Sequence, residues 1–141
     1  MNLYAESSAL LALLMREPAG PRVSEALEAA EIVAASDLTL IECDRVLIRA
    51  VALGKMAENG AATLRVSLNG LASHWQMLRI SPKIVERARQ PFPAEPLRTP
   101  DAIHLASALV ARSAIPGLQL LSLDDGIRAA ARPLGFQLQP A

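Results

Sequence analysis

The chain has 141 residues, enough for one domain with its own hydrophobic core and too few for two, so we expect a single domain over residues 1–141. Fourteen basic residues balance fourteen acidic ones, which excludes a protein that coats nucleic acid through bulk charge but permits a basic rim around an acidic centre. Cys43 is the only cysteine, which excludes an internal disulfide, and the apolar run at residues 9–15 is too short to span a bilayer, so we expect a soluble cytoplasmic protein.

The N-terminal half predicts strands that alternate with helices. Buried strands are expected at residues 3–5 and 32–35, and helices at residues 9–15, 23–30, 38–53 and 61–74. Either Ser7 or Ser8 can cap the first helix, and Gly54 can end the third.

The C-terminal half continues the alternation around one proline-rich loop. Strands are expected at residues 76–80, 118–122 and 136–138, and helices at residues 82–89, 100–112 and 127–133. Thr99 is the expected N-cap of the helix that contains Asp101. Because strands and helices alternate throughout, we predict an α/β fold with a central parallel sheet of four or five strands, covered by helices on both faces.

Four carboxylates lie where the predicted strands give way to loops or near the starts of the helices that follow: Glu6, Glu42, Asp101 and Asp124. The carboxyl ends of parallel strands meet at one edge of a sheet, where such folds bind ligands. Carboxylates gathered there raise one another's pKa unless a cation intervenes, and oxygen ligands suit Mg²⁺ or Mn²⁺. We therefore expect these four residues to form a catalytic and metal-binding site.

Each acid also has an ordinary explanation when it is considered alone. A carboxylate in the first turn of a helix, such as Asp101, interacts favourably with the helix dipole by about 0.3–1 kcal/mol. Asp124 can be an N-cap, and Glu42 can pair with Arg45 or Arg49 on its own helix. Glu6 is harder to explain in this way, because it directly follows a buried strand. Arg45 is also a candidate contact for an RNA phosphate.

Three segments carry a resemblance to a known family: LYAESSAL at residues 3–10, LRTPDAIHLA at residues 97–106 and LSLDD at residues 121–125. Their order and spacing resemble those of PIN-domain ribonucleases, especially the VapC toxins of bacterial toxin–antitoxin pairs. The DAIHLA segment is the most specific of the three. The resemblance extends over essentially the whole chain and implies a PIN-like three-layer α/β/α fold.

The resemblance implies metal-dependent hydrolysis of RNA phosphodiester bonds. It implies that Glu6, Asp101 and Asp124 hold Mg²⁺ or Mn²⁺, with Glu42 as a further ligand or bound through water. It assigns the hydroxyl of Ser8 to the site, and Ser122 is a similar candidate for contact with the site or the substrate. It also implies a small antitoxin partner, whose C-terminal segment occupies the groove next to the acidic site, and a homodimer formed through apolar helix faces.

One position departs from the family pattern, since the first acid is usually Asp and here is Glu6. The additional methylene moves the carboxylate outward by about 1.5 Å, and Mg²⁺ tolerates little deviation from octahedral geometry. Three alternatives follow: a catalytically weakened PIN fold that acts as a binding module, a phosphohydrolase acting on DNA or a nucleotide, and a receiver-type phosphoacceptor domain. The last needs an Asp after the third strand and a Lys after a later strand, and this chain supplies neither.

His104 lies three residues after Asp101 and is a conceivable general base. A single His in an apolar helix is weak evidence for catalysis or ligation. We therefore expect a packed, hydrogen-bonded core histidine at this position.

Overall fold

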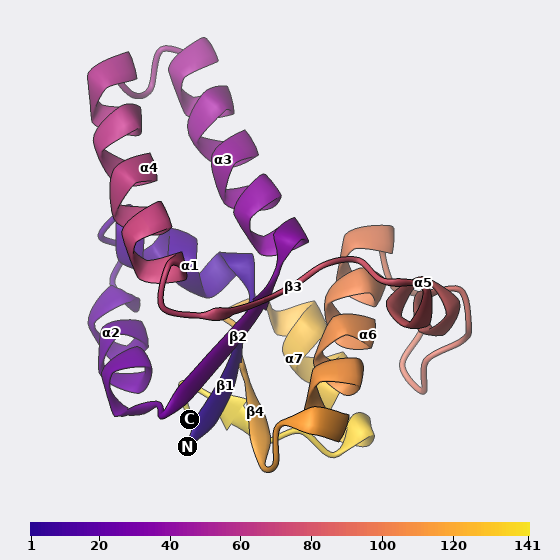
Figure 1. Ribbon diagram of the computed structural model, residues 1–141. Helices are drawn as coiled ribbons and strands as arrows, with labels where there is room; N and C mark the ends of the chain where they lie inside the picture. The colour runs from indigo at the N-terminus through magenta and orange to yellow at the C-terminus, as the bar shows by residue number, and fades with distance from the viewer.

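The computed structural model describes residues 1–141 and is organised around a five-stranded, fully parallel sheet (Figure 1). Its order is β3-β2-β1-β4-β5, with strands β1 (Asn2–Ala5), β2 (Ile32–Ser36), β3 (Gln76–Leu78), β4 (Leu118–Leu121) and β5 (Leu138–Gln139). In the central strand, Leu3 is in register with Val33 of β2 and with Gln119 of β4. The parallel α/β sheet predicted from the alternation of strands and helices is therefore confirmed.

Seven α-helices and one 3₁₀ helix connect these strands: α1 (Ser7–Leu14), α2 (Gly20–Ala29), α3 (Asp37–Ala52), α4 (Glu58–Ala72), α5 (Pro82–Ala88), α6 (Thr99–Ala114), α7 (Asp125–Ala131) and η1 (Arg132–Leu134). None of the helices is long and apolar enough to cross a membrane.

Alternate residues of the central strand enter two separate hydrophobic cores. Leu3 and Ala5 pack with apolar residues of α1, α2 and α4, whereas Tyr4 packs with those of α5, α6 and α7. This division follows from the strand geometry, because successive side chains point to opposite faces of a sheet. The helices consequently form a layer on each face, which is the three-layer arrangement predicted above (Figure 1).

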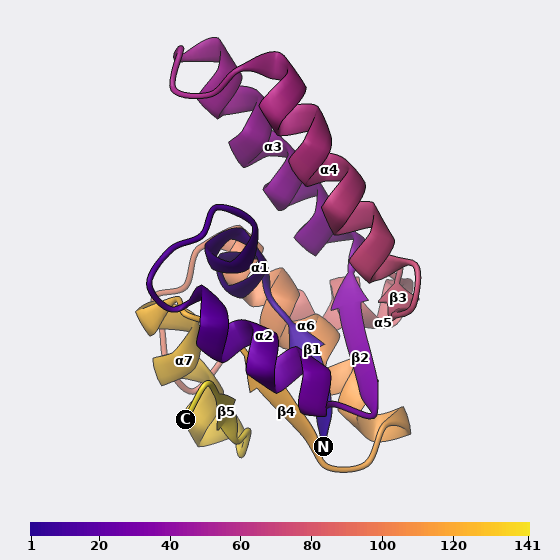
Figure 2. The ribbon, with the colours of Figure 1, turned by 90° about the vertical axis from the view of Figure 1, so that its left-hand side faces the viewer.

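Helices α3 and α4 form a hairpin that extends beyond the edge of the sheet (Figure 2). Gly54 follows the end of α3 with a φ of 70°, a left-handed conformation that glycine adopts without steric cost. An ion pair of 3.3 Å between Arg65 of α4 and Asp44 of α3 joins the two helices. Glu42 lies in the second turn of α3, near the point where this helix follows β2.

Three local predictions were wrong. The N-cap of α1 is Glu6, and neither Ser7 nor Ser8 caps the helix, because both hydroxyls donate to the Glu6 carboxylate instead. Helix α6 begins at Thr99 with Arg98 as its N-cap residue. The last strand starts at Leu138, two residues later than expected, because Gly135 has a φ of 87° and ends the preceding turn there.

Candidate active site

Strand and helix ends at the carboxyl edge of the sheet carry the four predicted acids. Glu6 directly follows β1, and its backbone N–H donates to Leu121 O of β4 at 3.0 Å. Glu42 lies in the second turn of α3, Asp101 in the first turn of α6, and Asp124 is the N-cap of α7. The chain leaves β1 toward β2 on one side and returns to β4 on the other, so this edge includes the switch point where such sheets bind ligands.

Three serine hydroxyls hold the buried carboxylate of Glu6, which is 4% exposed. Ser7 Oγ donates to Glu6 Oε1 at 2.9 Å, and Ser122 Oγ donates to Glu6 Oε2 at 2.7 Å. Ser8 Oγ donates to the same Oε2 atom. These hydrogen bonds satisfy carboxyl oxygens that have lost their contacts with water, so they offset the cost of burying a polar group.

The same serines also order the loop that carries Asp124. Ser8 Oγ accepts a hydrogen bond from Leu123 N at 2.9 Å, and Ser122 Oγ accepts one from Asp124 N at 3.1 Å. The end of β1 is thereby linked to the end of β4. Asp124 in turn accepts from Ile127 N at 2.9 Å, which confirms the ordinary N-cap role considered for it.

Glu42 is the end of a hydrogen-bond chain that begins at a buried tyrosine. Tyr4 Oη lies 2.9 Å from His104 Nδ1, and His104 Nε2 contacts Glu42 Oε1. Ser7 Oγ lies 3.0 Å from the same Glu42 oxygen, so one hydroxyl contacts both Glu6 and Glu42. The side chain of His104 is fully buried.

The direction of the Glu42 pKa shift indicates which atom donates in the hydrogen bond between His104 and Glu42. Burial raises the pKa of Glu42, but the hydrogen bond and charge of His104, together with Ser7 and Arg98, lower it more, and the net direction is downward. Glu42 is therefore an ionised acceptor, and His104 Nε2 carries the proton. On the other side of the ring, His104 Nδ1 contacts the Tyr4 hydroxyl, and burial raises the pKa of this tyrosine.

Asp101 and Asp124 share a single guanidinium. Arg98 Nε lies 3.2 Å from Asp101 Oδ2, and Arg98 Nη2 lies 3.4 Å from Asp101 Oδ1 and 3.7 Å from Asp124 Oδ2. Burial raises the pKa of Asp101, the hydrogen bond and charge of Arg98 lower it in part, and the charges of Asp124 and Glu6 raise it further. The net direction is upward, mainly because of burial, with a smaller contribution from repulsion by the other two carboxylates.

Glu6, Glu42 and His104 form a group that could hold a metal ion, and this group does not include Asp101 or Asp124. One ligand atom from each of Glu6, Glu42 and His104 lies within 4.8 Å of the others, and Arg98 already places positive charge between the two aspartates. Carboxylate oxygens are the ligands that Mg²⁺ and Mn²⁺ prefer. His104 does not ligate a metal while its Nε2 donates to Glu42, so it orients that carboxylate.

The other predicted site residues have different surroundings. Ser8 and Ser122 contact the Glu6 carboxylate, whereas Arg45 is exposed on α3 and makes no hydrogen bond or ion pair with any of the four acids. The alternative that Glu42 pairs with Arg45 or Arg49 is wrong, because Glu42 contacts His104 and Ser7.

Arg98 was not among the predicted metal-binding or catalytic residues. It precedes Asp101 by three positions, a spacing that brings side chains together on a helix and was available as a signal. His104 was expected as a packed, hydrogen-bonded residue, and the structure confirms that. Its contact with Glu42 joins residues 62 positions apart and had no local signal.

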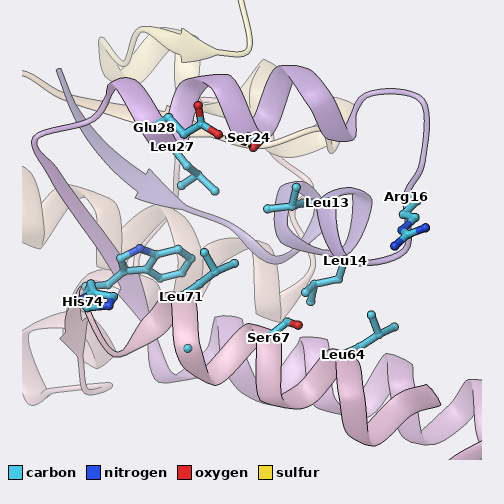
Figure 3. A pocket seen from close by; sticks show the side chains of 12 residues that line it. Leu13, Leu14, Arg16, Ser24, Leu27, Glu28, Leu64, Ser67, Leu71 and His74 are labelled. Carbon is cyan, nitrogen blue, oxygen red and sulfur yellow. Dashed lines mark hydrogen bonds between the residues drawn. The ribbon is translucent and has the colours of Figure 1, made fainter. Parts of the chain in front are cut away.

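An open apolar cavity of about 750 Å³ lies between α1, α2 and α4, on one face of the sheet (Figure 3). Leucines from all three helices line it together with Trp75: Leu13, Leu14, Leu27, Leu64 and Leu71. Arg16, Glu28 and His74 add polar groups. None of the four acids lines this cavity.

Comparison with known proteins gives consistent results. Residues 3–133 match the family model described as PIN domain. The chain is 31% identical to ribonuclease VapC46 of Mycobacterium tuberculosis over 145 aligned positions, which cover 95% of this chain and 93% of the relative. A toxin–antitoxin complex from Klebsiella pneumoniae contains a chain with a TM-score of 0.58 and 25% identity, with 88% of this chain and 87% of that chain covered. VapC20 of Mycobacterium tuberculosis, described as a sarcin–ricin loop cleaving toxin, has a TM-score of 0.67 at 15% identity, with 96% of each chain covered, and supports the fold.

Proposed function

Because this chain belongs to the PIN domain family, we propose that it is a metal-dependent endoribonuclease and the toxin of a toxin–antitoxin pair. The similarity to a relative named as a ribonuclease extends over nearly the whole of both chains, which supports the activity. Membership of the PIN domain family also excludes the alternative of a receiver-type phosphoacceptor domain. An RNA substrate makes the cytoplasm the expected location, and one PIN-like domain over residues 1–141 the expected unit.

The observation that carries the proposal is the position of four acids at the carboxyl edge of a parallel sheet, where Glu6 and Glu42 share Ser7 and the two aspartates share Arg98. We assign Glu6, Asp101 and Asp124 as metal ligands, and Glu42 as a further ligand or one bound through water. When bound, Mg²⁺ or Mn²⁺ supplies a lowered pKa for an attacking water and offsets negative charge on the leaving oxygen.

The remaining site residues act on the carboxylates or on the RNA. Ser7, Ser8 and Ser122 hold the Glu6 carboxylate in one orientation. His104 does the same for Glu42. Arg45, exposed on α3, is our candidate contact for an RNA phosphate, with Ser8 and Ser122 closer to the acids. Since aromatic residues make up only 3% of the chain, we expect recognition of RNA backbone and shape more than base stacking.

The test is cleavage of structured RNA by purified protein with Mg²⁺ or Mn²⁺, compared with EDTA, for the unmodified chain and for Asp101→Asn. We expect cleavage that requires the metal and falls by about 100-fold or more in the variant, because a carboxylate ligand is lost. Circular dichroism serves as the folding control. Metal-dependent cleavage that persists in Asp101→Asn contradicts the assignment, and no cleavage by the unmodified protein favours the binding-module alternative.

We further propose that the C-terminal segment of the antitoxin occupies the groove next to the acidic site, and that a separate apolar segment of the antitoxin packs into the cavity between α1, α2 and α4. The similarity to a toxin–antitoxin complex at 25% identity supports a partner of this kind. The cavity offers leucine side chains and Trp75 to such a segment, and burial of apolar surface is the main driving force for association of this type.

We also propose a homodimer in which α5 and the start of α6 contact a second copy. Ile80 and Val85 are 38% and 43% exposed beside a cavity of about 310 Å³ that Phe92 and Ile103 also line. Apolar residues clustered in this way are typical of subunit contacts. Light scattering on the purified protein checks the proposal, and a monomer mass at micromolar concentration contradicts it.

A further inference from the structure

We propose that Arg98 is an internal counter-ion that competes with the divalent cation for Asp101 and Asp124 and, once displaced, binds the RNA phosphate. This inference rests on the proposed function of the same site. It assigns Arg98 two roles with opposite effects, since the residue opposes metal binding and promotes cleavage.

Arg98 occupies the oxygen atoms that a metal would need. Its guanidinium contacts both carboxylate oxygens of Asp101, at 3.2 and 3.4 Å, and reaches Asp124 Oδ2 at 3.7 Å. A divalent cation bound at Asp101 would lie close to this guanidinium, and the two positive charges would repel one another. Each cation therefore weakens the binding of the other, so removal of the guanidinium raises the apparent affinity for the metal.

The differences in burial indicate which partner moves. The Arg98 side chain is 75% exposed, whereas those of Asp101 and Asp124 are 10% and 29% exposed. Asp101 is fixed in the first turn of α6, and Asp124 is fixed by its capping bond to Ile127 N. Exposed ion pairs are weak and easily exchanged, so the arginine swings away while the carboxylates remain in place.

The chemistry of the guanidinium supports its second role. Arg98 is the N-cap residue of α6, so its backbone stays at the rim of the acidic site when the side chain moves. Its planar fork of donors matches the oxygens of a phosphate and binds them bidentately.

The experiment measures metal binding and cleavage separately. The dissociation constant for Mn²⁺ is determined by calorimetry without RNA, for the unmodified protein, Arg98→Ala and Arg98→Lys. Arg132→Ala is the matched control, because Arg132 is exposed in η1 and makes no ion pair. We expect Arg98→Ala to bind Mn²⁺ about three- to fivefold more tightly, the change typical of losing an exposed pair. RNA cleavage at saturating Mn²⁺ should fall by about tenfold or more.

Arg98→Lys keeps the charge without the fork, so it should bind Mn²⁺ with an affinity between those of the other two proteins and should cleave poorly. An unchanged or weaker Mn²⁺ affinity in Arg98→Ala overturns the competition. Full cleavage by Arg98→Ala at saturating Mn²⁺ overturns the phosphate contact. If the unmodified protein neither binds Mn²⁺ nor cleaves RNA, the proposed function itself has failed, which is distinct from a failure confined to Arg98.

Discussion

Glu6 is the residue at which this chain departs from the family pattern, and its surroundings are built for the longer side chain. Three hydroxyls donate to its carboxylate, and the one from Ser122 comes from the end of a different strand. A shorter side chain at this position would withdraw the carboxylate by about one bond length, or roughly 1.5 Å. That displacement exceeds the tolerance of a hydrogen bond, so the contact with Ser122 would break.

We therefore predict that Glu6→Asp, although it restores the usual family residue, lowers activity. The free energy of unfolding should fall by about 1 kcal/mol through lost hydrogen bonds, and kcat/KM for RNA cleavage by about tenfold. Urea unfolding and initial rates at saturating metal measure the two quantities. Ser122→Ala is the matched control, because it removes one of the three hydroxyls and leaves Glu6 in place. Faster cleavage by Glu6→Asp would contradict the prediction and would mean that the site is better suited to the shorter aspartate side chain.

The positions of the acids were predictable because each one is adjacent to a local signal, such as the end of an apolar run or the start of a helix. Their partners were not predictable in the same way. The contact between Glu42 and His104 and the one between Arg98 and Asp124 depend on how α3, α6 and α7 meet above the sheet. Ser7 and Ser8 were misjudged because capping is the common role of a serine before a helix, and a carboxylate next to them in the chain competes for the same hydroxyls.

At the scale of elements, the approach of α2 to α1 depends on a glycine. A Cβ atom built on Gly20 would lie 2.9 Å from the backbone oxygen of Ala12, which cannot move as a flexible side chain can. Gly70, in the fourth turn of α4, has no atom within 4 Å of the corresponding position. Both glycines lie in helices, but only Gly20 is in close contact with another helix, whereas Gly70 has open space around it.

We predict opposite effects on stability when each of these glycines is replaced by alanine. Gly20→Ala should lower the free energy of unfolding by about 1–3 kcal/mol, because it forces the α1–α2 contact apart. Gly70→Ala should raise it by about 0.4–1 kcal/mol, since alanine restricts the unfolded chain and favours the helix. Urea denaturation under identical conditions compares the two, and a stabilised Gly20→Ala protein would contradict the close approach.

The strands were predicted more accurately than their ends. Buried strands of a parallel sheet are short apolar runs, so β1, β2 and β4 were evident from composition alone. The edge strands β3 and β5 have only three and two residues and are partly exposed. Their limits depend on pairing with a single neighbour, which a sequence pattern does not specify.

On the scale of the whole molecule, the acidic edge and the apolar cavity are separate surfaces. The cavity lies between α1, α2 and α4, and the four acids do not line it. A substitution in the cavity can therefore lower the affinity for a partner without changing the residues that we assign to catalysis. That separation allows the antitoxin proposal to be tested independently of the ribonuclease proposal.

Ser67 provides the substitution for that test, because it is exposed at the cavity on α4 and its hydroxyl bonds only to Thr63 O of its own helix. We predict that Ser67→Arg weakens binding of the cognate antitoxin by about tenfold or more, since a long charged side chain obstructs an apolar cavity. RNA cleavage by the free protein should be unchanged. Asn69→Arg introduces the same residue two positions further along α4, outside the cavity lining, and should bind the antitoxin normally. Calorimetric titration of both variants measures the difference, and equal affinities would place the antitoxin on another face of the molecule.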